Sequence, residues 1–493
     1  MFYNDKILIG KSGEKELYIL PNKANRHGLI TGASGSGKTI TLKVMAESFS
    51  AAGVPVFLAD VKGDLAGTCL PGVSNDKIAE RLSKLELNDF PFEGFPTVFW
   101  DVYGEAGHPI RTTVANVGSV ILSRMLDLSE TQAGVLAIAF KIAKDQNWEL
   151  VDLKDLRLLL QHIGDHRKDY TLNYGNVSIQ SIGGIQRSIL MLQEQGGDFF
   201  FGEPSIDISD FIKFDTETGY GHINILHAAE LFKQPILYSC FLLWLLTFLN
   251  QNLPEVGDLS KPRIVFFFDE AHLLFDDMPK YMLTQVTQVV KLIRSKGIGL
   301  YFISQTPNDI PDEIQSQLGN RVQHTLRAYT PAEQKIVKTV ASSFRINPSI
   351  NTEEAILALG TGEALISFVN ENGEPGIVEK ATILPPQSKM GIIDDATRAS
   401  VIQRSRFYGK YDKPIDRETA FEAIQAKLET QENQQANGQE ESNQKSASPK
   451  ATKTSKKKKP TTLQKAVTRT TNSALNTIGR KIGNGFFNLF KKH

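Results

Sequence analysis

The sequence is poor in cysteine, carries no net charge and contains no apolar run long enough to cross a membrane. Its 493 residues include only two cysteines, Cys69 and Cys240, which are too few for a disulfide framework and lack metal-ligand spacing. Such low cysteine usage is typical of a reducing compartment. The longest apolar run, 236–249, covers 14 residues and suits a buried helix better than a membrane span. The N-terminus shows no export signal, so we expect a soluble, cytoplasmic protein.

A glycine-rich segment carries the strongest chemical pattern, a complete G-x-x-x-x-G-K-T at residues 32–39. An apolar strand (27–31) precedes it and an amphipathic helix (38–51) is expected to follow, which is the context of a phosphate-binding loop. Its backbone N–H groups and the helix N-terminus favour the phosphates of a nucleotide. Lys38 is expected to reach the β and γ phosphates of ATP, and Thr39 to ligate Mg²⁺. The predicted cofactor-binding residues are Gly32, Ala33, Ser34, Gly35, Ser36, Gly37, Lys38, Thr39 and Ile40.

Two adjacent carboxylates, Asp269 and Glu270, follow the apolar run 264–268. The run predicts a buried strand, and ligands of open α/β sheets lie at the carboxyl ends of strands. With the phosphate loop, the pair indicates that Asp269 holds Mg²⁺ and that Glu270 orients and polarises the attacking water. Alone, such a pair is about as often a helix cap.

Three further residues are candidates for sensing or completing the nucleotide site. Gln305 ends the next predicted strand (299–304) and is placed to sense the γ phosphate, or else to face solvent. Arg294 and Arg321 lie on either side of Gln305 in the chain. Either arginine could reach the ATP of a neighbouring subunit, and a plain surface or salt-bridge role is the alternative for both.

The segment 60–64, after the predicted strand 54–59, also faces the nucleotide side of the sheet. Asp60 or Asp64 could support Mg²⁺ or the loop, and an ordinary turn is the alternative. His272 fits a packing role better than a metal-ligand role.

Strand and helix periodicities together predict an α/β fold with a mainly parallel sheet, interrupted by a largely helical insertion. The expected segments are a short N-terminal β element (1–28), the first part of the ATPase core (29–107), the mainly helical insertion (108–220), the second part of the core (221–400) and a C-terminal helical segment (401–427), followed by a disordered linker (428–462) and a basic amphipathic tail (463–493).

The linker and tail are predicted from composition. Residues 429–462 contain no large apolar side chain, so they cannot offset the entropy of ordering. In the tail, apolar residues such as Phe486, Phe487 and Phe490 are interleaved with lysine and arginine. Such a segment could bind a phosphate backbone or an anionic membrane surface, or simply remain solvated.

Four segments, in order, resemble the HerA-like ATPases of the HerA–FtsK superfamily: HGLITGASGSGKT, VFLADVKGDLAG, IVFFFDEAHLLF, and KLIRSKGIGLYFISQTPNDIP running on to LGNRV. They are spread over residues 27–322, and the insertion and basic tail resemble a bacterial subgroup. The resemblance implies a RecA-like P-loop core, a homo-oligomeric ring (a hexamer), and ATP-driven movement of DNA through its channel. It places Lys38, Thr39, Asp269, Glu270 and Gln305 in the nucleotide site and favours Arg294 as the residue acting in trans.

The resemblance has one departure. HerA proteins usually carry a β-barrel before the P-loop, whereas 31 residues precede Gly32 here. That barrel helps to build the ring and to engage a nuclease partner, so a ring and a nuclease partner are less firmly implied than ATP hydrolysis. The alternatives are a nucleotide-switched scaffold or membrane-surface ATPase, and a motor acting on peptides or protein complexes.

Overall fold

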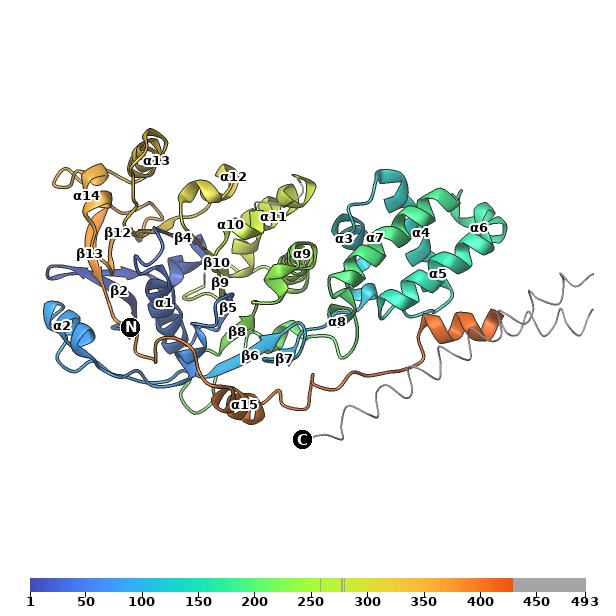
Figure 1. Ribbon diagram of the computed structural model, residues 1–493, viewed down its shortest axis with the longest axis horizontal. Coiled ribbons are helices and arrows are strands. Elements are labelled where there is room, and N and C mark those ends of the chain that lie inside the picture. Colours follow the sequence, from blue (N-terminus) through green and yellow to red (C-terminus); the bar gives the residue numbers. More distant parts are fainter. Residues whose placement is uncertain (258, 276–277, 279, 429–493) are drawn as a thin grey trace, which may run out of the picture. The chain divides into compact units, whose positions relative to one another are not determined.

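The computed structural model describes residues 1–257, 259–275, 278 and 280–428, and these contain one 13-stranded sheet (Figure 1). The predicted tail (463–493) and all but the first residue of the predicted linker lie outside the described residues. The strands are β1 (Phe2–Tyr3), β2 (Lys6–Ser12), β3 (Lys15–Ile19), β4 (Gly28–Thr31), β5 (Val56–Asp60), β6 (Thr97–Asp101), β7 (His108–Pro109), β8 (Ile223–His227), β9 (Ile264–Phe268), β10 (Ile298–Ser304), β11 (Asn320–Gln323), β12 (Glu363–Ser367) and β13 (Glu379–Ile383).

The sheet is parallel over most of its width. Its order is β1-β2-β13-β12-β11-β4-β10-β9-β5-β8-β6-β7, with β3 paired to β2. Along this order, all pairings on the side of the sheet that runs from β11 through β4 to β7 are parallel. The pairing of β11 with β12 and all pairings among β12, β13, β2, β1 and β3 are antiparallel. The predicted α/β class with a mainly parallel sheet is therefore confirmed, and the carboxyl ends of β4, β10, β9 and β5 lie next to one another.

Strand β9 shows why the apolar run after residue 263 is continuous. Its side chains alternate between two cores: Phe266 and Phe268 pack in one, whereas Val265 and Phe267 pack in the other. Because successive side chains of a strand point to opposite faces, both faces of β9 are covered. Helix α1 (Lys38–Ala51) contributes to the second core, and α9 (Pro235–Asn252) and α11 (Lys280–Ile293) contribute to the first.

Between β7 and β8 the chain forms a group of helices that lie together beside that edge of the sheet (Figure 1). Helix α3 contacts α9, which joins this group to the core. Capping boxes at Ser129 and Asp152 start two of its helices. The helices are α3 (Val114–Met125), α4 (Glu130–Asp145), α5 (Leu153–Asp165), α6 (Arg167–Tyr174), α7 (Ile179–Glu194) and α8 (Gly197–Phe200).

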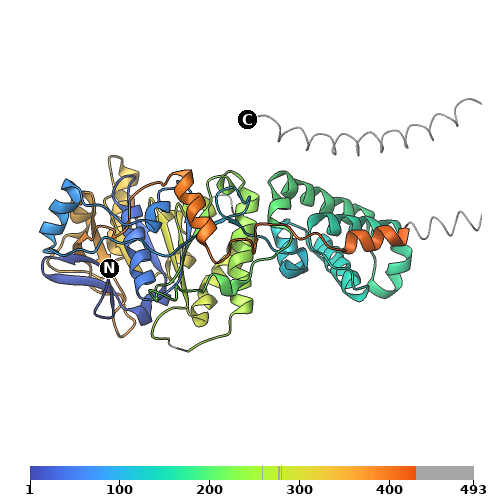
Figure 2. The same cartoon turned by 90° about the horizontal axis from the view of Figure 1, so that it is seen from below.

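A C-terminal strap, residues 405–419, connects core and insertion (Figure 2). Tyr411 is buried against Trp100 of β6, and its hydroxyl donates to Asp210 at 2.5 Å. Farther on, the N–H of Ala420 donates to the carbonyl of Glu149 at 2.9 Å. Within the predicted helical segment 401–427, helix is thus confined to the end of α15 (Asp395–Arg404) and to residues 420–427.

Two boundaries differ from what the sequence predicts. Apolar residues near 321–328 predict a short strand, but the strand is only β11 (Asn320–Gln323), because Thr325 turns toward the phosphate loop and its carbonyl accepts the Ala33 N–H at 2.8 Å. The helical pattern that begins near 279 predicts a helix to about 295, whereas Arg294 lies in a 3₁₀ turn (Arg294–Lys296) after α11. None of the helices in the described ranges has the length and hydropathy needed to cross a bilayer.

Candidate nucleotide site

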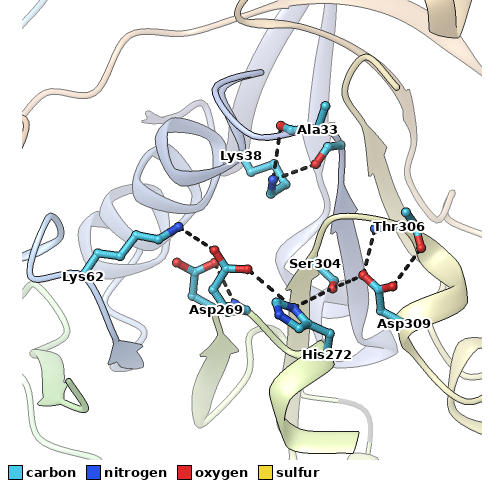
Figure 3. Close-up of polar contacts among 10 residues, drawn as sticks. Ala33, Lys38, Lys62, Asp269, His272, Ser304, Thr306 and Asp309 are labelled. Carbon is cyan, nitrogen blue, oxygen red and sulfur yellow. Dashed lines mark hydrogen bonds and ion pairs between the residues drawn. The ribbon is translucent and has the colours of Figure 1, made fainter. Parts of the chain in front are cut away.

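The start of the loop between β4 and α1 is hydrogen-bonded to the residues that follow β10 and β11, the strands on either side of β4. The N–H of Gly32 donates to the Gln305 carbonyl at 3.2 Å, and the N–H of Ala33 donates to that of Thr325 at 2.8 Å. The strands that flank β4 in the sheet therefore fix the start of the loop. Lys38 folds back over it, donating to the carbonyls of Gly32 at 2.6 Å and Ala33 at 3.3 Å (Figure 3).

A second layer of contacts supports the far side of the loop. The N–H of Gly362, just before β12, donates to the Ser36 carbonyl at 3.0 Å. The Arg81 guanidinium, on α2 (Asp76–Lys84), donates to the carbonyls of Gly362 and Thr361 at 3.1 and 2.8 Å. A Cβ at Gly32 would lie 2.5 Å from the Cβ of His324, so the loop and the residue that follows β11 approach too closely for a side chain at position 32.

Asp269 and Glu270 lie at the carboxyl end of β9, beside this loop. The N–H of Ala271 donates to the Ile303 carbonyl of β10 at 2.8 Å, which ties the acidic pair to the neighbouring strand. Asp269 is buried and accepts the N–H of Glu270 at 2.9 Å. Glu270 itself has φ +49°, in the left-handed region that non-glycine residues seldom adopt.

The Glu270 carboxylate lies between two basic side chains. Its Oε1 accepts Lys62 Nζ at 2.5 Å, and its Oε2 lies 3.5 Å from His272 Nδ1 (Figure 3). The Ser304 hydroxyl, 3.5 Å from the same His272 nitrogen, donates to Asp309 at 2.5 Å. This polar chain runs from the acidic pair to the turn after β10.

Charge and burial shift the titration of the central groups. Burial, and then the neighbouring Glu270 charge, raises the pKa of Asp269 to about 6. Burial lowers the pKa of Lys38, while the charges of Glu270 and Asp269 oppose that shift. The site thus holds partly buried groups of opposite charge, which would interact strongly with a phosphate and a cation.

The residues present fit a magnesium ion bound together with phosphate. Asp269 supplies a buried carboxylate, and Thr39 supplies a hydroxyl in the first turn of α1. Among the described residues, Glu270 Oε2 and Asp64 Oδ1 are buried oxygens without a hydrogen-bond partner. No group of three or more His, Cys, Asp or Glu side chains in that part of the chain is arranged to hold a metal alone. Mg²⁺ commonly takes one or two protein oxygens and completes its shell with phosphate and water.

The other predicted residues differ in whether they lie on the side of the sheet where the phosphate loop is. Gln305 is exposed directly after β10, at the edge where the phosphate loop lies. Asp60 forms a turn, since its carboxylate accepts the N–H groups of Gly63 at 2.7 Å and Leu65 at 3.2 Å. Arg294 precedes β10 and Arg321 is at the start of β11, so both lie toward the amino ends of the parallel strands. Neither arginine is brought to the phosphate loop of its own chain.

Sequence reasoning missed three residues that build the site: Lys62, Arg81 and His324. Lys62 stands between the two aspartates that were considered, and the neighbouring strand ends could have indicated its place beside Glu270. Arg81 and His324 carry no sequence pattern, because they act on backbone and side-chain atoms far away in the chain.

The sequence profile described as "Helicase HerA-like C-terminal" matches residues 5–490. The chain belongs to this family. It is therefore a HerA-like member of the HerA–FtsK superfamily of P-loop NTPases, and this membership supports ATP hydrolysis as its chemistry.

Individual relatives agree with this assignment. The chain is 22% identical over 377 residues to the DNA double-strand break repair helicase HerA of Sulfurisphaera tokodaii, covering 74% of this chain and 67% of that protein. It is 23% identical over 372 residues to the protein of the same description from Sulfolobus acidocaldarius, covering 73% and 65%. The HerA-like chain thus spans about two thirds of the length of these relatives.

A solved structure of the plasmid coupling protein TrwB with a non-hydrolysable ATP analogue has a similar fold. Its TM-score is 0.51 at 14% sequence identity, covering 78% of this chain and 90% of TrwB. At that identity the likeness concerns the fold alone.

Proposed function

We propose that this HerA-like chain is an ATP-hydrolysing, Mg²⁺-dependent motor that moves along DNA as a homohexameric ring. The observation that carries the ATPase part is the meeting of Lys38, Asp269 and Glu270 at the carboxyl edge of the sheet, after the strands β4 and β9 that flank β10. The DNA part is supported by family membership and by relatives described as DNA repair helicases.

Each residue then has a defined task. Lys38 leaves the carbonyls of Gly32 and Ala33 and binds the β and γ phosphates, which the loop N–H groups also surround. Thr39 and Asp269 would hold Mg²⁺, which supplies charge neutralisation for the transferring phosphoryl group. Glu270 orients and polarises the attacking water, and Gln305, exposed at the end of β10, senses the γ phosphate.

The placement of the arginines supports action between subunits. Arg294 lies near the amino edge of the sheet, opposite its own phosphate loop, so it can assist hydrolysis only in a neighbouring subunit. Arg321 is engaged within its chain, donating to the carbonyls of Leu318 and Gln315, both at 3.2 Å. We propose the trans role for Arg294 because the resemblance to HerA-like ATPases favours it.

Partners and location complete the proposal. DNA is the substrate, a nuclease is a candidate partner, and the chain acts in the cytoplasm. The basic segment 463–493 could add a contact to DNA or to an anionic membrane surface. This segment lies outside the described residues, so the proposal for it stands on sequence.

The test is the steady-state ATPase rate as a function of protein concentration, with and without single- and double-stranded DNA. A rate per subunit that rises with concentration and again with DNA is expected for a ring whose arginine acts in trans. The Arg294→Ala variant should lose the rise with concentration while still binding nucleotide. A slow rate indifferent to both variables would favour a nucleotide-switched scaffold over a DNA motor.

A further inference from the structure

Lys62 and Glu270 are brought together by strand pairing. Strands β5 and β9 are parallel neighbours, with Ala59 opposite Phe268. The loops that leave their carboxyl ends therefore run side by side. Lys62 stands two residues beyond the end of β5, and Glu270 two residues beyond the end of β9. Their contact is a consequence of the fold, not of two long side chains meeting by chance.

The two oxygens of the Glu270 carboxylate have different surroundings. Oε1 accepts a hydrogen bond from Lys62 Nζ at 2.5 Å. Oε2 is buried, has no hydrogen-bond partner among the described residues, and lies 3.5 Å from His272 Nδ1. The Glu270 side chain is 12% exposed, so its rotation is limited by packing. An unsatisfied carboxylate oxygen beside a phosphate loop is an acceptor available to a water molecule.

We propose that Lys62 is a positioning residue, which holds Glu270 by Oε1 so that Oε2 faces the attacking water. This inference rests on the proposed ATPase function and adds a residue to it. Lys62 does not touch the nucleotide in this role; it acts through Glu270.

The strained backbone of Glu270 is a second feature that the ion pair with Lys62 would help to fix. Glu270 adopts a left-handed backbone conformation at φ +49°, which costs a non-glycine residue free energy and persists where the surroundings fix it. The N–H of Glu270 donates to the Asp269 carboxylate at 2.9 Å. Lys62 binds the Glu270 carboxylate, so the backbone and the carboxylate of Glu270 are both restrained.

The charges agree with this role. Two adjacent carboxylates at the end of β9 repel each other, and Lys62 is the cation in direct contact with one of them. Lys38 is held elsewhere, on the carbonyls of Gly32 and Ala33. The two lysines therefore divide the work: Lys38 serves the phosphates, and Lys62 serves the glutamate.

The experiment measures kcat and KM for ATP with the full chain carrying Lys62→Met. Because a misplaced catalytic group loses roughly 10- to 100-fold in rate, we expect kcat to fall by that factor while KM changes by less than about threefold. Lys62→Arg, which keeps a cation on a long stem, should recover much of the rate. Binding of a non-hydrolysable ATP analogue reports that the variant folds and that its phosphate loop is intact.

A double-mutant cycle tests whether Lys62 acts through Glu270. In single-turnover measurements, Lys62→Met combined with Glu270→Gln should be no slower than Glu270→Gln alone, since a positioning residue has nothing left to position. The matched control is Lys15→Met. Lys15 pairs with Glu379 at the same 2.5 Å and is 61% exposed against 56% for Lys62, but it lies on β3. This control should leave kcat unchanged.

Several outcomes would overturn the inference. A kcat that is unchanged or raised by Lys62→Met would show that the ion pair is unimportant or restraining. A raised KM at constant kcat would place Lys62 on the nucleotide instead. If Glu270→Gln itself turned over normally, the proposed role of Glu270 would fail first. A dead Glu270→Gln beside a fully active Lys62→Met would remove only the inference about Lys62.

Discussion

The Nε2 atom of His324 lies 2.8 Å from the hydroxyl of Thr41, within the first turns of α1. Its other ring nitrogen, Nδ1, lies 2.9 Å from the Glu363 carbonyl. A neutral imidazole satisfies both partners, donating from Nδ1 to the carbonyl and accepting the Thr41 hydroxyl at Nε2. His324 thus links the helix that starts at the phosphate loop to β12.

This arrangement predicts that His324 makes an unfavourable contribution to stability in mild acid. Burial lowers the pKa of His324 from 6.5 to about 4, and the pKa of buried His27 is lowered similarly. Above pH 6.5 both histidines are neutral in the folded and in the unfolded chain, so they cause no loss of stability. Below it the unfolded chain binds the proton first, so stability falls until the folded pKa is reached, by up to about 3 kcal/mol per histidine. Asp60 and Asp269 act in the opposite direction, because the pKa of each is raised to about 6.

Urea midpoints at pH 7.5 and 5.0 measure this effect for the native chain and for His324→Gln. The variant should be less stable at pH 7.5, having lost the Thr41 contact, but the difference in unfolding free energy between the two proteins should shrink at pH 5.0. An equal pH dependence in both proteins would contradict the assignment of a neutral, buried His324.

Lys38→Ala should abolish hydrolysis with little effect on folding. Among the described residues its amine is bonded to loop carbonyls alone, and phosphate binding needs it. Removal should therefore cost at least about 100-fold in kcat/KM, comparable to other lost electrostatic stabilisers. The thermal midpoint should change little, as for other partly exposed side chains. A variant that kept its ATPase rate would show that the phosphate site has been misassigned.

Gly362→Ala should destabilise the support of the phosphate loop more than Gly409→Ala does. Both glycines have a left-handed backbone, with φ +76° and +80°, so each substitution incurs similar strain, about 1–2 kcal/mol. At Gly362 a Cβ would also overlap the Arg81 guanidinium, whereas at Gly409 it would meet open space. Only Gly362→Ala should therefore also raise KM for ATP, which paired melting curves and ATPase assays would show. Equal effects on both would mean that the Arg81 contact does not support the loop.

The parallel core was predictable because its signals are local. The run 264–268 is apolar throughout because its side chains fill two cores, and the glycine pattern before Lys38 fixes a loop conformation. Strand β6 was not predicted, since Thr97–Asp101 is short and the residues beside it show no regular apolar pattern. The antiparallel strand β13 was missed for the same reason.

Sequence motifs predicted individual residues of the candidate site but not the contacts between them. Glu270 was found because it follows a strand, but its left-handed backbone and its bond to Lys62 depend on the packing of β5 against β9. The trans role proposed for Arg294 depends on a second subunit, whose position the structure of one chain does not give.

The most direct test of the central claim is ATP-dependent displacement of a triplex-forming strand from duplex DNA, at low salt where phosphate contacts are strong. The account predicts displacement by the native chain with ATP and Mg²⁺, none with a non-hydrolysable analogue, and none by Glu270→Gln despite retained ATP binding. Steady ATP hydrolysis with no displacement at any DNA length would contradict DNA translocation and leave an ATPase that drives some other movement.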